Sequence, residues 1–445
     1  MKTPICDYVS KYVSDNKIRM HMPGHKGVGL LGYEAYDITE IDGADSLYEA
    51  QGIIKQSEDI ATDIFGFRTF YSTEGSSQCI RAMLFLLCLS RTDKSTKPLI
   101  LAGRNAHKTF LSAVALLDID VAWIFPTADE SYLSCGITSE RLEKILTNTN
   151  RKPDAVYITT PDYLGNIVDI KPLANVCYKY GVKLIVDNAH GAYLKFLPES
   201  EHPIDLGADL CCDSAHKTLP ALTGAAYLHL SESMLNVRSQ TVKEALAQFG
   251  STSPSYLILQ SLDYLNNYLT DGYNNKLFNF IKKVDLLKND LKTHGYTLLN
   301  TEKLKITIDT KAAGYYGRDF AQELYNRGVV VEYSDPDFTV LMLTPENADD
   351  IADLKEALFD INFKSPIIDS KPQLFIPETR ISFRDAFLSQ DIEIDVSDAA
   401  GRVVSRSTVG CPPAVPIVVS GEVISQEAVR CFEYYGINRC KVIIE

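Results

Sequence analysis

The sequence predicts an α/β protein with a central, mostly parallel sheet, followed by a smaller α+β region. Between residues 68 and 217, short apolar runs alternate with helical patterns, as in βα units. Polar residues follow several of these runs, where the carboxyl ends of strands would lie. The pattern changes near residue 272, where a long amphipathic helix begins. A chain of 445 residues is long enough for two or three domains.

The elements expected in the first part of the chain follow a regular order. A helix over 52–65 should end at Gly66, because glycine readily terminates a helix. A short strand from residue 68, a turn at 74–77 and a long apolar helix come next. Further strands are expected at 98–102, 121–125, 155–159, 182–186 and 210–212, with helices after residue 108 and at 138–146 and 172–180.

The C-terminal part reads as a different kind of domain. Helices are expected at 277–295, 318–328 and 346–361, and strands at 297–300, 305–310, 329–335 and 338–343. We therefore expect an N-terminal arm (1–28), a large domain (29–271) and a C-terminal α+β domain (272–445).

Composition argues against several classes of partner. The formal net charge of −14 disfavours binding to nucleic acid or to an anionic membrane, and no basic run offsets it. The N-terminus lacks a signal peptide, and no apolar stretch is long enough to span a membrane. The ten cysteines form no Cys-x-x-Cys pair, so we expect reduced thiols in a cytoplasmic protein and no metal site.

Lys217 is the first candidate functional residue. It lies just after a predicted buried strand, beside His216 and Ser214. Burial disfavours an ammonium ion, and a neutral lysine amine attacks carbonyl groups to form Schiff bases. An ordinary loop lysine is the alternative.

Other polar residues end neighbouring predicted strands. Ser76 and Ser77 stand at a strand-to-helix turn, where free backbone N–H groups can bind an anion, although Ser77 could simply cap the helix. His107, Asp187 and His190 also follow predicted strands. Ligands of open parallel sheets bind at this edge, so the set predicts one site.

The combination suggests a particular cofactor. The chain contains no P-loop, no G-x-G-x-x-G turn and no G-x-S-x-G elbow. An anion-binding turn, a carboxylate and a Schiff-base lysine together suit pyridoxal 5′-phosphate (PLP).

A series of motifs resembles the bacterial ornithine/lysine/arginine decarboxylases, which have the aspartate-aminotransferase fold. The matching segments, in family order, are 21–27, 37–40 with Asp45, 75–77, 104–108, 187–191, 214–218, 251–256 and 261–263. A looser match covers Gly401-Arg402, 411–413 and Gly421-Glu422. The resemblance implies a PLP-dependent transferase fold in a short form without the N-terminal wing domain of larger members.

The resemblance also implies roles for these residues. Lys217 would carry the cofactor, Asp187 would pair with its ring nitrogen, and His107 would stack on the ring. His190 would lie beside the ring. The residues implied at the phosphate are Ser76, Ser77, Ser214 and His216, with Thr252 and Ser253 reaching the phosphate of a neighbouring subunit. For Asp187 a helix cap, for His107 a core histidine and for the Thr252–Ser253 pair a simple turn remain alternatives.

Three positions depart from the family pattern. Glu74 stands where a neutral residue is usual beside the phosphate, so we expect its side chain to point away. Arg406 occupies the place of a glutamate near the Gly-Arg pair, and a cation there would repel a basic substrate. The run that begins at Cys411 also differs from the family sequence.

The sequence therefore predicts a PLP-dependent amino-acid α-decarboxylase, similar to lysine, arginine or ornithine decarboxylases, with a small-molecule amino-acid substrate. We expect it to be a homodimer with shared sites, or a higher oligomer. An aminotransferase or a β/γ-lyase using the same cofactor site is the alternative reaction. A PLP-binding regulator without turnover is the alternative from another class.

Overall fold

A computed structural model describes residues 2–128, 130–369, 371–407 and 412–444. The chain divides into two compact units, which are described separately. The first unit comprises Met1–Lys94, Asp154–Val156 and Ile170–Leu277; the second comprises Ser95–Pro153, Tyr157–Asp169 and Phe278–Glu445. The three domains expected from the sequence, with boundaries after residues 28 and 271, stay a prediction.

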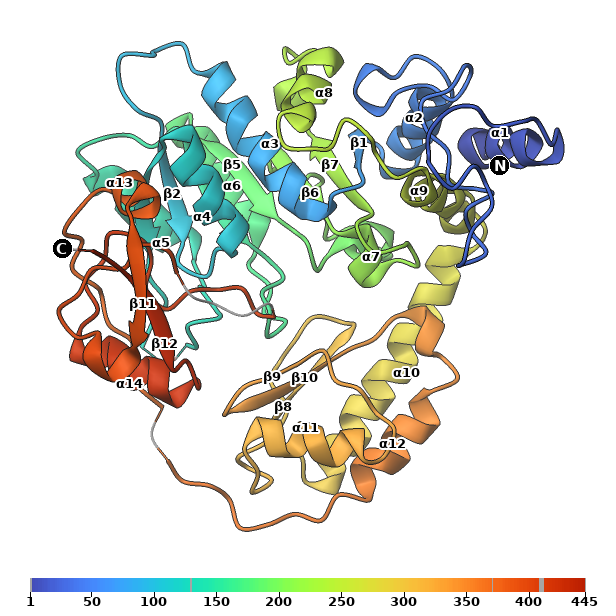
Figure 1. Ribbon diagram of the computed structural model, residues 1–445. Helices are drawn as coiled ribbons and strands as arrows, with labels where there is room; N and C mark the ends of the chain where they lie inside the picture. Colours follow the sequence, from blue (N-terminus) through green and yellow to red (C-terminus); the bar gives the residue numbers. More distant parts are fainter. Residues whose placement is uncertain (1, 129, 370, 408–411, 445) are drawn as a thin grey trace. The chain divides into compact units, whose positions relative to one another are not determined.

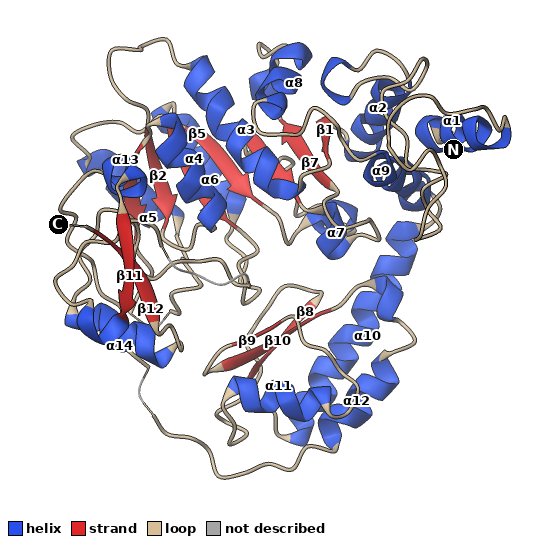
Figure 2. Ribbon diagram, viewed as in Figure 1, coloured by secondary structure: helices blue, strands red, loops and turns tan. Residues whose placement is uncertain are grey.

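The central sheet has seven strands in the order β1-β7-β6-β5-β4-β2-β3. Their bounds are β1 Arg68–Ser72, β2 Leu99–Gly103, β3 Asp120–Ile124, β4 Ala155–Thr159, β5 Lys183–Asp187, β6 Leu210–Asp213 and β7 Ala226–Leu230. The pairs β5–β6 and β2–β3 are parallel, whereas β7 is antiparallel to both β1 and β6. Strands alternate with helices along the chain (Figures 1 and 2), which confirms the predicted α/β class.

The first unit contains the helices predicted at 52–65, after the turn at 74–77 and at 172–180, together with further helices that the sequence analysis did not predict. They are α1 Pro4–Ser14, α2 Ile53–Phe65, α3 Gly75–Ser90, α6 Ile170–Tyr180, α7 Ala215–Thr218, α8 Ser239–Ala247 and α9 Tyr256–Thr270. Helix α2 ends at Gly66, whose φ of 76° is left-handed and therefore suits glycine. Helix α3 buries Ile80, Met83 and Leu87, consistent with its long apolar run.

The N-terminal arm begins with a helix that is fastened to α9. The buried carboxylate of Asp263 accepts the backbone N–H groups of Ile5 at 3.0 Å and Cys6 at 2.9 Å. It also accepts the hydroxyl of Ser57 at 2.6 Å. Asp45 similarly accepts the backbone N–H groups of residues 51, 52 and 54 at the start of α2. These two motif aspartates therefore serve as anchors for backbone segments.

The second unit contains β2, β3 and two smaller sheets. Its helices are α4 Lys108–Leu117, α5 Ser139–Asn148, α11 Gly317–Tyr325, α12 Ile351–Phe359, α13 Phe383–Leu388 and α14 Gln426–Tyr434, and α10 Tyr273–His294 enters it from the first unit. Strands β8 Lys305–Asp309, β9 Tyr333–Ser334 and β10 Phe338–Met342 form one sheet in the order β8-β10-β9. Strands β11 Asp391–Asp395 and β12 Arg439–Ile443 pair antiparallel.

Two expected strands of this unit are largely absent. Only Tyr333–Ser334 of the segment 329–335 is a strand, because only these residues pair with β10. The segment 297–300 makes one isolated bridge, Leu298 with Ile308. Apolar β-branched residues favour a strand, but backbone pairing decides whether one forms. Within the described ranges, no helix is long and apolar enough to cross a membrane.

Candidate active site

Asp187 is the last residue of β5, and its side chain is buried. Its Oδ1 accepts the backbone N–H of Ala189 at 3.2 Å. The same oxygen lies 3.7 Å from Sγ of Cys212, which pairs with Asp187 across β5 and β6. Burial and then the charge of Asp187 raise the pKa of Cys212, so its thiol stays protonated and can donate to the carboxylate.

Lys217 lies on the short helix α7, which follows β6 directly. Its Nζ is 3.1 Å from Nε2 of His190, a buried residue just beyond the end of β5. The lysine itself is partly exposed and is not sealed in apolar surroundings. The amine of Lys217 therefore reaches the same strand end that carries Asp187.

The predicted anion site is at the N-terminus of α3. Ser214 donates its hydroxyl to Oγ of Ser76 at 2.8 Å, so these two predicted phosphate residues meet. Gly75 opens the helix with a φ of 69°, and its N–H donates to the carbonyl of Gly224 at 2.8 Å. Ser77 lies in the same first turn. The partial positive charge of this helix end favours an anion.

Two buried hydroxyls close in sequence to the predicted site residues have no partner in the part of the protein that the structure describes. Within the described residues, Oγ1 of Thr73 and Oγ1 of Thr218 are buried and lack a hydrogen-bond partner. Thr73 precedes the α3 turn, and Thr218 follows Lys217. Unsatisfied buried hydroxyls cost free energy, and a phosphate-bearing cofactor supplies oxygens that can accept from them. The residues present therefore fit PLP.

His216 is oriented by the backbone of the following loop. Its Nδ1 lies 2.9 Å from the carbonyl oxygen of Ala225, so Nδ1 carries a proton and donates. Burial, opposed by this hydrogen bond, lowers the pKa of His216. In the neutral ring Nε2 is then an acceptor, and it donates to a phosphate only after a second proton binds.

His107 belongs to the second unit, whereas the other predicted site residues belong to the first. It is the N-cap of α4, and its Nδ1 accepts the backbone N–H of Thr109 at 3.1 Å. This contact places the proton of the neutral ring on Nε2. The expected stacking of His107 on the cofactor ring stays a prediction.

Thr252 and Ser253 lie on the loop between α8 and α9, and both are exposed. Glu74 is also exposed, and its Oε1 accepts the backbone N–H of Ser251 at 3.4 Å. The carboxylate of Glu74 is therefore directed to this loop.

Of the two departures from the family pattern near the C-terminus, the structure accounts for one, Arg406. Arg406 forms an ion pair with Asp391 of β11, so its charge is already balanced by a carboxylate. Cys411 lies outside the described residues.

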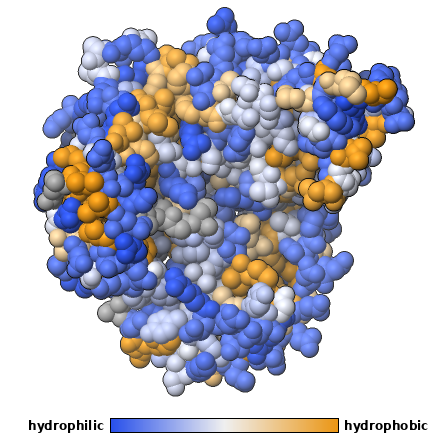
Figure 3. Space-filling view, viewed as in Figure 1, coloured by the Kyte–Doolittle hydropathy of each residue, from blue (hydrophilic) through white to orange (hydrophobic). Residues whose placement is uncertain are grey.

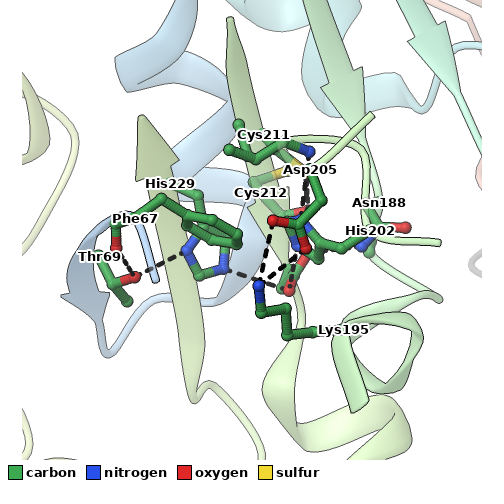
Figure 4. A network of polar contacts seen from close by, with 12 residues as sticks. Phe67, Thr69, Asn188, Lys195, His202, Asp205, Cys211, Cys212 and His229 are labelled. Atoms are coloured by element: carbon green, nitrogen blue, oxygen red, sulfur yellow. Dashed lines mark hydrogen bonds and ion pairs between the residues drawn. The ribbon is translucent and has the colours of Figure 1, made fainter. Parts of the chain in front are cut away.

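The sequence reasoning missed a buried polar network next to the site. Asp213, at the end of β6, contacts His202, His229 and Asn188, and all four side chains are buried (Figure 4). The one sequence signal for this network was Asp213, a carboxylate at the end of an apolar strand. The two histidines belong to no motif, and only folding brings them to Asp213.

Comparison with known proteins decides the family. The sequence model of the Orn/Lys/Arg decarboxylase major domain matches residues 3–310. The chain belongs to the Orn/Lys/Arg decarboxylase family. It is a PLP-dependent amino-acid decarboxylase, and nothing in the comparisons supports the aminotransferase or β/γ-lyase alternative.

Relatives of this decarboxylase match along nearly the whole chain. The arginine decarboxylase of Bacillus subtilis is 30% identical, with 96% of this chain and 92% of the relative covered. The arginine decarboxylase of Halalkalibacterium halodurans is 28% identical over 96% of this chain and 91% of its own length. The lysine decarboxylase structure from Francisella novicida, only 16% identical, superposes with a TM-score of 0.81 over 99% of this chain and 81% of its own length. It therefore shares the fold.

Proposed function

We propose that this decarboxylase acts on a basic amino acid, with arginine as the first candidate. The observation that carries the proposal is the similarity over 96% of the chain to relatives named arginine decarboxylase. The net charge of −14 favours the approach of a cationic substrate. The pairing of Arg406 with Asp391 reduces the repulsion that an unpaired arginine would exert.

We further propose that the residues gathered around α7 hold PLP. When bound, PLP supplies an electron sink for the electron pair left as the bond from Cα to the carboxylate breaks. Lys217 binds the cofactor through its amine, and His190 orients that amine from 3.1 Å. The carboxylate of Asp187 favours a protonated ring nitrogen.

The phosphate is bound in this proposal by the N-terminus of α3. Ser76, Ser77 and Ser214 supply hydroxyls, and His216 supplies a further donor once the negative charge of the bound phosphate draws a second proton to its ring. The resemblance to the family assigns His107 to the face of the cofactor ring. A proton replaces CO₂ at Cα, so the products are one amine and one CO₂ per amino acid.

A CO₂-release screen over arginine, lysine, ornithine, acidic and neutral amino acids tests this function. We expect release from arginine above all. Formation of keto acid or ammonia without CO₂ would contradict the reaction, and release from a non-basic amino acid alone would contradict the substrate class. Lys217→Ala should abolish both activity and borohydride-dependent covalent retention of PLP while the protein remains folded. Retention in that variant would assign the attachment to another lysine.

We propose that the active form is at least a homodimer. The arm next to α1 exposes a group of large apolar side chains, each more than 60% exposed, which is unusual for a free surface (Figure 3, upper right). They are Ile18, Met20, Met22, Val28, Leu30, Leu31 and Tyr33. The exposure of Thr252 and Ser253 suits residues that reach a neighbouring subunit.

Light scattering and PLP titration of the same samples test the shared site. Thr252→Ala with Ser253→Ala should weaken PLP binding at least about tenfold, since the loss of even one hydrogen bond to a charged group, worth about 1.5–3 kcal/mol, reduces affinity by that factor. Wild-type PLP affinity should also fall when dilution dissociates the dimer. A monomer with undiminished affinity would contradict this proposal.

We propose that the enzyme works in the cytoplasm and that its amine product enters polyamine biosynthesis. The nine cysteines in the described part of the chain are free thiols, which suits a reducing compartment. Subcellular fractionation tests the location, and loss of polyamines after deletion of the gene tests the role. We expect no nucleic-acid or membrane partner.

A further inference from the structure

Asp213 is a fully buried carboxylate that three different segments hold in place. Nε2 of His202 and Nε2 of His229 each lie 3.2 Å from its Oδ2. Asn188 donates its side-chain amide to Oδ1 at 2.7 Å. Burial acts to raise the pKa of Asp213, but the two facing histidines outweigh it and hold this pKa below its ordinary value. Asp213 is therefore an ionised acceptor inside the protein.

The hydrogen bonds define this cluster as a network of donors around one carboxylate. The backbone N–H of Ile204 donates to Nδ1 of His202 at 3.2 Å, so Nε2 of His202 carries the proton that points to Asp213. His202, Cys211 and Asp213 have the mutual spacing of metal ligands. A protonated Nε2 offers no lone pair to a metal, however, and burial raises the pKa of Cys211, which keeps its thiol protonated.

Asn188 connects this network to the cofactor-binding edge of the sheet. It directly follows Asp187, and its backbone N–H donates to the carbonyl of Cys212 at 3.0 Å. Its side chain is packed so closely that a Cβ on Gly191 would lie 2.0 Å from its Oδ1. Asp213 thus fixes the orientation of the Asn188 amide, because only Nδ2 can donate to a carboxylate. The ends of β5 and β6 are joined by backbone and side chain alike.

We propose that Asp213 is a positioning residue for the cofactor, acting through Asn188 on Asp187. It holds the end of β5 in the place where the Asp187 carboxylate meets the ring nitrogen. This inference rests on the role proposed for Asp187. Figure 4 shows Asn188, His202 and His229 in one region, with Lys195 and Asp205 close by. Lys195 and Asp205 form an ion pair of their own, and their side chains are 18% and 30% exposed.

The test measures PLP affinity of the apoprotein by fluorescence titration together with its urea unfolding curve. Asn188→Ala removes the link and leaves Asp213 with both histidines. We expect it and Asp213→Asn to weaken PLP binding about tenfold, the effect of losing one hydrogen bond to a charged group. Asp205→Asn makes the same chemical change at an exposed position beside the network and should alter affinity less than twofold. An equal loss in Asp205→Asn would overturn the proposal.

A double-mutant cycle separates positioning from general destabilisation. In an Asp187→Asn background, Asn188→Ala should change PLP affinity less than twofold, because the group it positions is gone. The same tenfold loss in both backgrounds, or no loss in either, would overturn the inference. If Asp213→Asn does not fold, the Asn188→Ala cycle alone decides. If Asp187→Asn leaves PLP affinity unchanged, the role proposed for Asp187 is refuted, and so is the inference that rests on it. If Asp187→Asn weakens PLP binding but Asn188→Ala does not, only the inference about Asp213 is refuted.

Discussion

Replacement of Lys243 tests how the first unit holds α8, the helix that leads to the Thr252–Ser253 loop. Lys243 forms an ion pair with Glu58 of α2, and the two side chains are only 5% and 4% exposed. Glu58 also accepts the backbone N–H of Tyr71 at 2.9 Å. Burial raises the pKa of Glu58 although Lys243 acts to lower it. In Lys243→Met the buried carboxylate loses its counter-charge.

The loss of stability has a ceiling, because Glu58 can take up a proton. Holding a carboxyl protonated costs about 1.4 kcal/mol for each pH unit above its unfolded pKa of about 4.3. Lys243→Met should therefore lower the free energy of unfolding by about 3–4 kcal/mol at pH 7, in the range known for broken buried ion pairs. In this variant the folded-state pKa of Glu58 lies above the unfolded value, so stability is lost as pH rises. At pH 5.5 the deficit should shrink to about 1.5 kcal/mol.

Urea unfolding of wild type and variant at pH 7 and pH 5.5 measures both values. Glu58→Gln combined with Lys243→Met is the matched control, since glutamine can still accept the N–H of Tyr71 and carries no charge. This double variant should be within about 1 kcal/mol of wild type at both pH values. A deficit in Lys243→Met that is the same at both pH values would refute the reasoning, because a packing defect alone does not titrate.

Three further outcomes are expected. Asp263→Ala should release α1, with a loss of about 2–4 kcal/mol and earlier proteolysis of the arm, since two backbone N–H groups lose their acceptor; an unchanged cleavage pattern would show that other contacts hold α1. The thiols of Cys6 and Cys88 should react slowly with a disulfide reagent at pH 8, because burial raises their pKa values to about 12 and about 11; rapid labelling of the folded protein would contradict this. Arg406→Gln should change the KM for arginine less than about threefold, because Asp391 already balances its charge, and a tenfold fall would show that Arg406 repels the substrate.

Local sequence signals were sufficient for six of the seven strands of the large sheet, whereas β7 was not predicted. The strand predicted at 155–159 forms over those residues, and the helix predicted to end at Gly66 does so. The periodic spacing of apolar residues and the glycines that end helices are local features, so they can be recognised in the sequence. The contacts between Lys217 and His190 and between Ser76 and Ser214 agree with the prediction that strand ends meet at one edge.

Long-range pairing explains where the same reasoning was wrong. The valines before Tyr333 have strong strand propensity, yet Val330 is exposed and unpaired with β10. The motif aspartates Asp45 and Asp263 stand in the family pattern without a local sign of their task. The carboxylate of Asp263 meets the N–H groups of Ile5 and Cys6 only when α1 and α9 pack together, because these residues are far apart in the chain. Asp45, in contrast, binds the start of α2 within ten residues of itself.

By itself, the sequence determined the fold class, the cofactor and the lysine that we expect to bind it, because these depend on local periodicity and on short motifs. Tertiary structure alone decided the network around Asp213. His202 and His229 are 11 and 16 residues away from it in the chain, and neither side chain is part of a pattern. A buried carboxylate needs hydrogen-bond donors, and in the folded protein these donors can come from any segment of the chain. The spacing of residues in the sequence therefore does not predict which donors they are.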